Sequence, residues 1–154
     1  MDLKCQYDYV KSSRQVLLHY CKSISEIDFV TENSSFGRGS IRNLLVHIGN
    51  TYEFWIGRHA LNFEMSFTPY NTVKDAAQAE ALFLSIDSLI TKFIDVYSGR
   101  YLEELAFEIN DQKQTATPLK LFTHVITHEF HHKGQILSLS RQLGYVPVDT
   151  DIIR

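Results

Sequence analysis

The sequence has few of the features that mark membrane, secreted or nucleic-acid-binding proteins. No stretch of its 154 residues approaches the roughly 20 consecutive apolar residues of a membrane-spanning helix. The N-terminus lacks the basic-then-apolar pattern of a secretory signal. The net charge is −3, and no dense stripe of lysine and arginine is present to bind a phosphate backbone. We therefore expect a cytoplasmic protein that binds neither a membrane nor nucleic acid.

Cysteine is scarce as well, and its placement excludes an internal disulfide. The two cysteines, Cys5 and Cys21, fall within one expected helix. At roughly 1.5 Å of rise per residue they would lie about 24 Å apart, whereas a disulfide needs Cα atoms within about 7 Å. We predict two free thiols, as in a reducing compartment.

What the sequence does contain is a set of long amphipathic segments. Apolar residues recur at helical spacing in residues 3–23, 40–64, 76–97 and 118–143. Ser40, Asp75 and Thr117 stand where N-caps of the last three segments are expected, since their side chains can accept hydrogen bonds from free N–H groups. Gly99 and Gly144 follow the last two segments as helix stops. The pattern predicts four helices.

Such helices can bury their apolar stripes only against one another. We therefore expect residues 1–154 to form a single all-α domain, a four-helix bundle. Residues 31–39 have the composition of a turn. Residues 102–116, with an apolar run followed by Asn110 and Asp111, are expected to form a short hairpin or irregular excursion before the last helix.

Histidine is abundant, with seven in the chain and four of them between residues 124 and 132. His128 and His132 are i, i+4 neighbours on the inward side of the last helix, where two imidazoles can reach one ion from adjacent turns. His47, in the middle of the second helix, is the natural third ligand. A single inward histidine is usually a packing residue, but three suitably placed ones favour a divalent metal ion. Three imidazoles leave coordination positions open, as in catalytic sites.

A zinc peptidase is the main misreading of this segment. His128 to His132 match H-E-x-x-H, in which the glutamate acts as general base. The longer peptidase motif fails, because Gln135 stands in place of glycine and Ser138 in place of histidine. The residues after His132 are also too few for the usual C-terminal subdomain. We disfavour a peptidase and expect Glu129 to lie on a solvated face.

Residues 128–135, His-Glu-Phe-His-His-Lys-Gly-Gln, resemble the last-helix signature H-x-x-x-H-R-G-Q of the DinB/YfiT-like metalloenzyme family. Residues 44–47, Leu-Leu-Val-His, resemble its second-helix context. The resemblance covers essentially the whole chain and departs at Lys133, where arginine is usual and bidentate pairing is lost. It implies a four-helix bundle, often a homodimer, with a three-histidine site for zinc, nickel or iron, of which we favour zinc or nickel.

The resemblance also implies a class of chemistry. Characterised relatives include bacillithiol S-transferases and the mycothiol-dependent maleylpyruvate isomerase. The first hypothesis is therefore a metal-dependent enzyme acting on a small molecule, such as a low-molecular-weight-thiol S-transferase or a related hydrolase. The alternative is a non-catalytic metal- or ligand-binding bundle in stress response. Because bacterial thiol cofactors are acidic, we predict that Lys133 and Arg42 contact the substrate.

Other residues near the predicted site are assigned supporting roles. His124 and His131 either hydrogen-bond behind the ligands or are surface histidines. Gln135 is expected to be a structural hydrogen-bonding residue, and Gly134 to permit close helix packing. His19 and His59 are expected to be structural. Trp55 and the tyrosines are expected to lie in the core or to form a pocket wall.

Overall fold

The computed structural model describes residues 2–33, 35 and 37–154. Met1 and two residues of the predicted turn, Ser34 and Phe36, lie outside the described residues. The described part is mostly helical, with one small antiparallel sheet, as expected in broad outline. Its elements in chain order are α1 (Leu3–Cys21), α2 (Glu26–Val30), α3 (Ile41–Tyr52), the π-helix η1 (Glu53–Ala60), the 3₁₀-helix η2 (Tyr70–Thr72), α4 (Ala76–Val96), β1 (Leu105–Ile109), β2 (Gln112–Ala116) and α5 (Pro118–Gln142).

The predicted helix boundaries are set by local hydrogen bonds. The side chains of Ser40, Asp75 and Thr117 accept from the backbone N–H three residues on, which confirms all three N-caps. Gly99 and Gly144 have φ of 76° and 94°, a left-handed conformation that glycine adopts without steric cost. These residues therefore end α4 and α5 as predicted.

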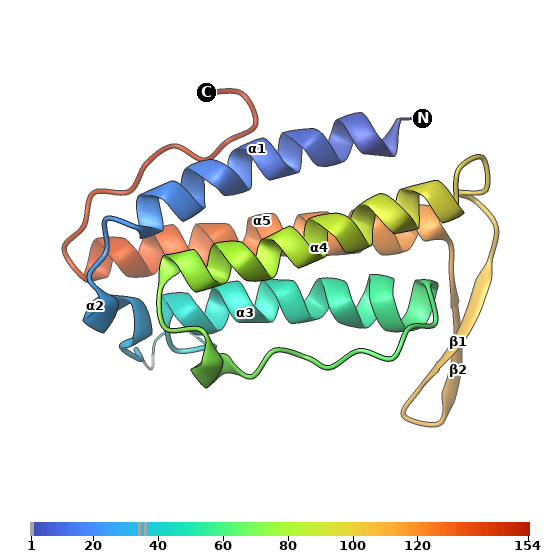
Figure 1. Cartoon of the computed structure of the whole chain (residues 1–154), viewed down its shortest axis with the longest axis horizontal. Coiled ribbons are helices and arrows are strands. Elements are labelled where there is room, and N and C mark those ends of the chain that lie inside the picture. Colours follow the sequence, from blue (N-terminus) through green and yellow to red (C-terminus); the bar gives the residue numbers. More distant parts are fainter. Residues whose placement is uncertain (1, 34, 36) are drawn as a thin grey trace.

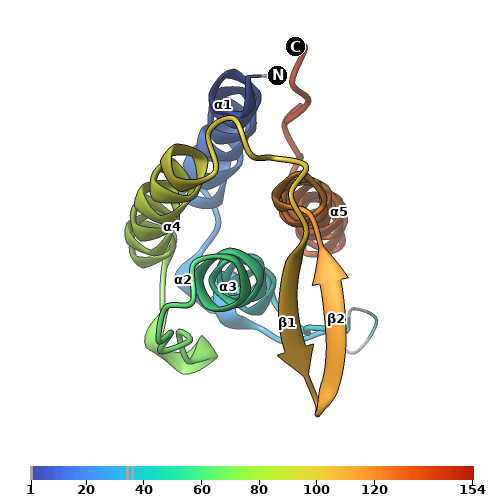
Figure 2. The ribbon, with the colours of Figure 1, turned by 90° about the vertical axis from the view of Figure 1, so that its right-hand side faces the viewer.

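The four longest helices lie side by side and roughly along one direction (Figure 1). Seen from one end, α1, α4, α3 and α5 follow one another around a central core (Figure 2). Helix α3 packs against both α4 and α5, and α1 packs against the same two helices from the other side. The apolar stripes meet in this core, where the largest side chains with almost no exposure include Tyr52, Phe29, Phe93 and Phe122.

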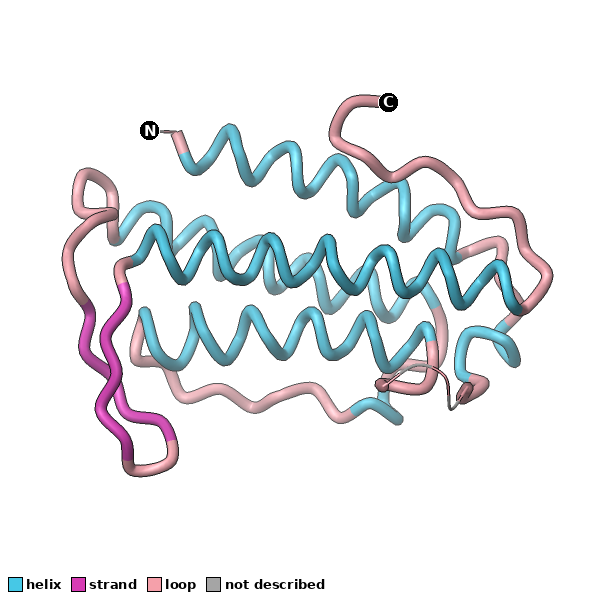
Figure 3. The backbone as a smooth tube through the Cα atoms, turned by 180° about the vertical axis from the view of Figure 1, so that it is seen from behind, coloured by secondary structure: helices cyan, strands magenta, loops and turns pink. Residues whose placement is uncertain are grey.

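The excursion before the last helix is a β-hairpin beside one end of the helices (Figure 3). Ile109 pairs with Gln112, so Asn110 and Asp111 form a two-residue turn, and both have positive φ, 51° and 61°. This is the conformation that the right-handed twist of hairpin strands favours, and asparagine and aspartate tolerate it well.

Two predicted segments differ from the structure. The short helix α2 follows a turn that closes α1, and it was not expected. The second predicted helix does not run to residue 64: α3 passes into η1, which ends at Ala60, and residues 63–69 follow as a stretched segment outside any helix or strand (Figure 3). Asn62 leaves the helix with a φ of 57°. The Asn50 side chain then hydrogen-bonds both the N–H and the carbonyl of Thr68 at 3.0 Å, which holds the extended segment along α3.

Both cysteines are free, as predicted, with Cys5 exposed and Cys21 buried. Burial raises the pKa of the Cys21 thiol to about 12. Within the described residues, no helix combines the length and the apolar character needed to cross a membrane.

Candidate metal centre

The three predicted ligands come together where α3 packs against α5. His47 projects from α3, and His128 and His132 project from successive turns of α5. One nitrogen from each ring can be chosen so that all three lie within 4.8 Å of one another. The ring centroids of His47 lie 4.8 Å from those of both partners, and those of His128 and His132 lie 4.3 Å apart. The structure thus supports the grouping of these residues, and the bound metal itself stays a prediction.

All three imidazoles are held in the neutral form that metal coordination requires. Burial, reinforced by the charge of Arg38 and by His132, lowers the pKa of His47 to about 4. Burial and the neighbouring histidines lower the pKa of His128 to about 3. Burial also lowers the pKa of His132, although its hydrogen bond to Gln135 opposes the shift. Lone pairs are therefore available at neutral pH.

Gln135 orients one of the ligands. Its Oε1 lies 2.6 Å from Nδ1 of His132, so this ring nitrogen donates and Nε2 keeps its lone pair. The amide nitrogen of Gln135 lies 3.3 Å from Nε2 of His131, which accepts. The prediction of a structural hydrogen-bonding residue is confirmed. Its contact with the ligand His132 goes beyond that prediction, although the i, i+3 spacing permits it.

The two ligand nitrogens on α5 are spaced as two ligands of one ion would be. Nε2 of His132 faces Nε2 of His128 at 3.1 Å. Tetrahedral bonds of about 2 Å to one ion would place two nitrogens at a closely similar separation. Among the described residues, buried Nδ1 of His128 has no hydrogen-bond partner. Three nitrogen ligands of this kind suit zinc, nickel or iron.

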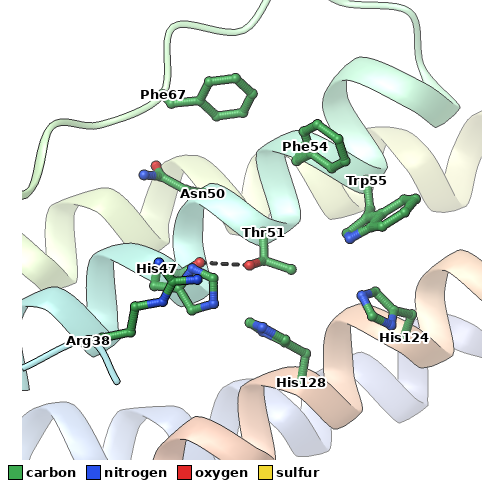
Figure 4. A pocket seen from close by; sticks show the side chains of 9 residues that line it. All are labelled: Arg38, His47, Asn50, Thr51, Phe54, Trp55, Phe67, His124 and His128. Atoms are coloured by element: carbon green, nitrogen blue, oxygen red, sulfur yellow. Dashed lines mark hydrogen bonds between the residues drawn. The ribbon is translucent and has the colours of Figure 1, made fainter. Parts of the chain in front are cut away.

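A cavity of about 510 Å³ opens beside the cluster, and His47 and His128 form part of its wall (Figure 4). Phe54 and Trp55 of η1 and Phe67 of the extended segment form an aromatic wall at the other end. The π-helix places Phe54 and Trp55 there, and such wide turns often occur at functional sites. Trp55 is half-buried, which confirms its prediction as a pocket wall.

The remaining histidines occupy different surroundings. His124 is exposed at the cavity wall, with its ring centroid 5.2 Å from that of Trp55. His131 is exposed and contacts the cluster through Gln135. His59 packs against Phe107 of β1 at 5.0 Å, and His19 is exposed on α1. Neither His19 nor His59 belongs to the three-histidine group.

Behind the ligands, a buried ion pair ties α5 to α1. Arg14 donates to both carboxylate oxygens of Glu129 at 2.9 Å, and the Tyr52 hydroxyl donates to the same carboxylate at 2.6 Å. Burial would lower the pKa of Arg14, but Glu129 and Tyr7 raise it well above its ordinary value. Burial and the Glu129 charge raise the pKa of Tyr52, which keeps this phenol protonated.

The solvated-face prediction for Glu129 is therefore wrong, since this side chain is fully buried. Its oxygens are occupied by Arg14 and Tyr52, which leaves no general base of the peptidase kind. Sequence reasoning overlooked Arg14, although it lies on the apolar stripe of α1 between Val10 and Leu17. A charged residue at such a core position is a signal for a buried partner.

Lys133 does not contact a substrate, because only 1% of it is exposed. Its ammonium group donates to Ser13 on α1 and, at 3.4 Å, to the carbonyl of Thr150 in the C-terminal tail. Arg42 is half-buried, bonds Asn43 and does not line the cavity.

The packing role predicted for Gly134 is also wrong. A Cβ atom built there would meet nothing within 4 Å, so no neighbouring helix requires a glycine at this position.

No curated protein matches this chain. The model of the DinB family, in contrast, matches residues 2–154, which is essentially the whole sequence. With its helical fold and its three clustered histidines, this chain belongs to the DinB family.

Proposed function

We propose that this protein is a metal-dependent enzyme built as a four-helix bundle, with one divalent ion held by His47, His128 and His132. The observation that carries the proposal is the convergence of three neutral imidazoles beside a substrate-sized cavity, with His47 and His128 forming part of its wall. Three ligands leave coordination positions open on the cavity side, whereas closed structural sites use four. Zinc or nickel is favoured over iron.

The proposed reaction is S-transfer from a low-molecular-weight thiol, or a related hydrolysis. A divalent ion in this site would lower the pKa of a thiol or water in an open position. The chain contributes by holding His132 in one tautomer through Gln135 and by lining the cavity with aromatic side chains that reduce access of water. A homodimer in the cytoplasm stays a prediction.

Metal content tests the site directly. Protein purified without an affinity tag should carry close to one equivalent of metal per chain. His47→Ala, His128→Ala and His132→Ala should each lose most of it, because each removes one of three ligands. His19→Ala and His59→Ala serve as controls and should retain metal. Full retention in the His47 variant would remove that residue from the site.

Activity is tested separately, by incubating metal-loaded protein with a small electrophile and, in turn, bacillithiol, mycothiol, glutathione and cysteine. Conjugate should form faster with the wild-type protein than with His132→Ala for at least one thiol. If metal binds and no thiol is turned over faster, the transferase assignment should be abandoned. The non-catalytic metal- or ligand-binding bundle would then be the better description.

A further inference from the structure

The cavity beside the histidines has two chemically different ends (Figure 4). Arg38 lies next to His47 at one end, and Phe54, Trp55 and Phe67 gather at the other. Its volume of about 510 Å³ lies within the range of pockets that bind small organic ligands. A molecule that spans this cavity meets a positive charge at one end and, at the other, mainly aromatic rings, with the His124 imidazole beside Trp55.

The polar end is positive. Arg38 is the one charged side chain among the described residues that line the cavity, and no acidic residue lines it. Arg38 forms no ion pair with an acidic side chain among the described residues. Its side chain lies beside His47, so its charge is close to the histidine cluster (Figure 4). Neutral imidazoles would also leave the charge of a bound cation uncompensated.

The middle of the cavity offers little further polar recognition. The Asn50 amide is engaged by both backbone groups of Thr68. The Thr51 hydroxyl donates to the carbonyl of His47 at 2.8 Å. Since these donors are already engaged, specificity for polar groups depends on Arg38, the metal centre and the His124 imidazole at the cavity wall.

The apolar end is preformed. Trp55 packs edge-on against Phe54, with ring centroids 5.1 Å apart, and against Phe107 of the hairpin at 6.1 Å. Phe67 is held opposite by the segment that Asn50 fixes to α3. Aromatic walls that need no reordering favour flat, apolar ligand groups.

We propose that the cavity binds a small organic carboxylate with an aromatic or similarly apolar body. The carboxylate lies between Arg38 and the metal centre, and the body lies against Phe54, Trp55 and Phe67. This inference rests on the proposed function, because it names the class of molecule on which that site acts. It also replaces Lys133 and Arg42 with Arg38 as the residue that recognises negative charge.

Trp55 is the sole tryptophan of the chain, so its fluorescence reports on this cavity directly. Zinc-loaded and metal-free protein would be titrated with phenylacetate, phenylacetamide and acetate, following Trp55 emission and confirming affinities by calorimetry. Phenylacetate should bind at least about tenfold more tightly than the other two, since only it matches both ends. Zinc affinity is measured in separate titrations.

Two variants and a control locate the contacts. Arg38→Ala should weaken phenylacetate binding about tenfold or more, because a charge-assisted hydrogen bond is lost. Phe67→Ala should reduce the ratio of the phenylacetate affinity to the acetate affinity. The ratio of the phenylacetate affinity to the phenylacetamide affinity should stay unchanged. Arg42→Ala, which removes a nearby arginine outside the cavity, should bind like wild type.

The outcomes separate this inference from the metal site. If zinc binds but phenylacetate does not, or if Arg38→Ala binds it as tightly as wild type, the carboxylate proposal is overturned and the metal site stands. If zinc fails to bind, the proposed function fails. Arg38-dependent binding of phenylacetate to the metal-free protein would then still support the carboxylate site, and its absence would overturn it.

Discussion

Within residues 128–135, adjacent side chains lie in opposite surroundings. His128 and His132 face the cavity side of α5, while Glu129 and Lys133, one position further on, are buried against α1. Each residue of an α-helix is turned by about 100° from the last, so the ligand pair and the buried charged pair occupy two separate stripes. The same short motif therefore carries both a candidate reactive site and part of the core.

Gln135→Ala should weaken metal binding about 10- to 100-fold without unfolding the protein. The substitution removes the acceptor that keeps His132 in the tautomer with a free Nε2, and residues in this position typically contribute that much to metal affinity. Competition with a chelator of known affinity measures the effect. Ser138→Ala, an exposed change one turn on, is the matched control. Equal affinities for the Gln135 variant and wild type would show that the tautomer is set by other means.

The grouping of the three histidines could be predicted from the sequence, but the partners of nearby charged residues could not. The spacing of His128 and His132 is a local property of one helix, and His47 lies beside the apolar stripe of another. Glu129 and Lys133 were assigned to the solvent and the substrate because charged side chains are rarely buried. Their partners, Arg14 and Ser13, lie over one hundred residues earlier in the chain, where helical periodicity gives no pairing information.

At the scale of elements, the C-terminal tail lies against α1 and α5 and hydrogen-bonds both helices. Removing residues 149–154 should lower the free energy of unfolding by about 1–3 kcal/mol, because the Ser13 hydroxyl and the Lys133 ammonium both lose the Thr150 carbonyl as an acceptor. Burial already lowers the pKa of Lys133 to about 8. Urea unfolding of the truncated and complete chains measures the loss.

A Lys133→Met background provides the control for this prediction. There the truncation should cost clearly less, because the buried charge that needed the acceptor is gone. An equal cost in both backgrounds would mean that the tail stabilises the protein through its other contacts, such as those of Arg154 with Ser12.

Regular elements with strong local signals were predictable, and irregular ones were not. The caps at Ser40, Asp75 and Thr117 and the hairpin around Asn110 are each determined by a few consecutive residues. The change from α3 to η1 and the extended segment after Ala60 are not determined by a few consecutive residues in this way. The apolar periodicity of the sequence continues through both, at Ile56 and Leu61. That segment is held by the Asn50 side chain, a tertiary contact that a helical pattern does not reveal.

For the whole molecule, stability of the metal-free protein should fall as the pH drops. His47 and His128 have folded-state pKa values of about 4 and 3, against about 6.5 in an unfolded chain. Between about pH 6.5 and pH 4 the unfolded chain binds protons that the folded protein does not, so the unfolding free energy decreases across this window. Urea unfolding of metal-free protein at several pH values measures it. His128→Gln should show a weaker dependence, and His19→Ala should follow wild type.

The same pKa values bear on metal release. Because the ligand histidines take up protons only near these lowered pKa values, protons displace the ion only at low pH. Metal occupancy of the site should therefore persist to about pH 5 and fall below that pH. Metal release with a midpoint near pH 6.5 would contradict the lowered pKa values. It would mean that the histidines titrate with their ordinary pKa.

The two stripes of α5 also set a limit on how this chain can change its length. An insertion or deletion of one residue between Glu129 and His132 would turn the downstream half of the helix by about 100°. His132 would leave the metal centre, and Lys133 would leave Ser13 and the tail in the same event. A loop can change its length without such a rotation, whereas an insertion or deletion here would disrupt the histidine cluster and the buried contacts of Lys133 together. Lineages that vary in length should therefore do so outside this stretch.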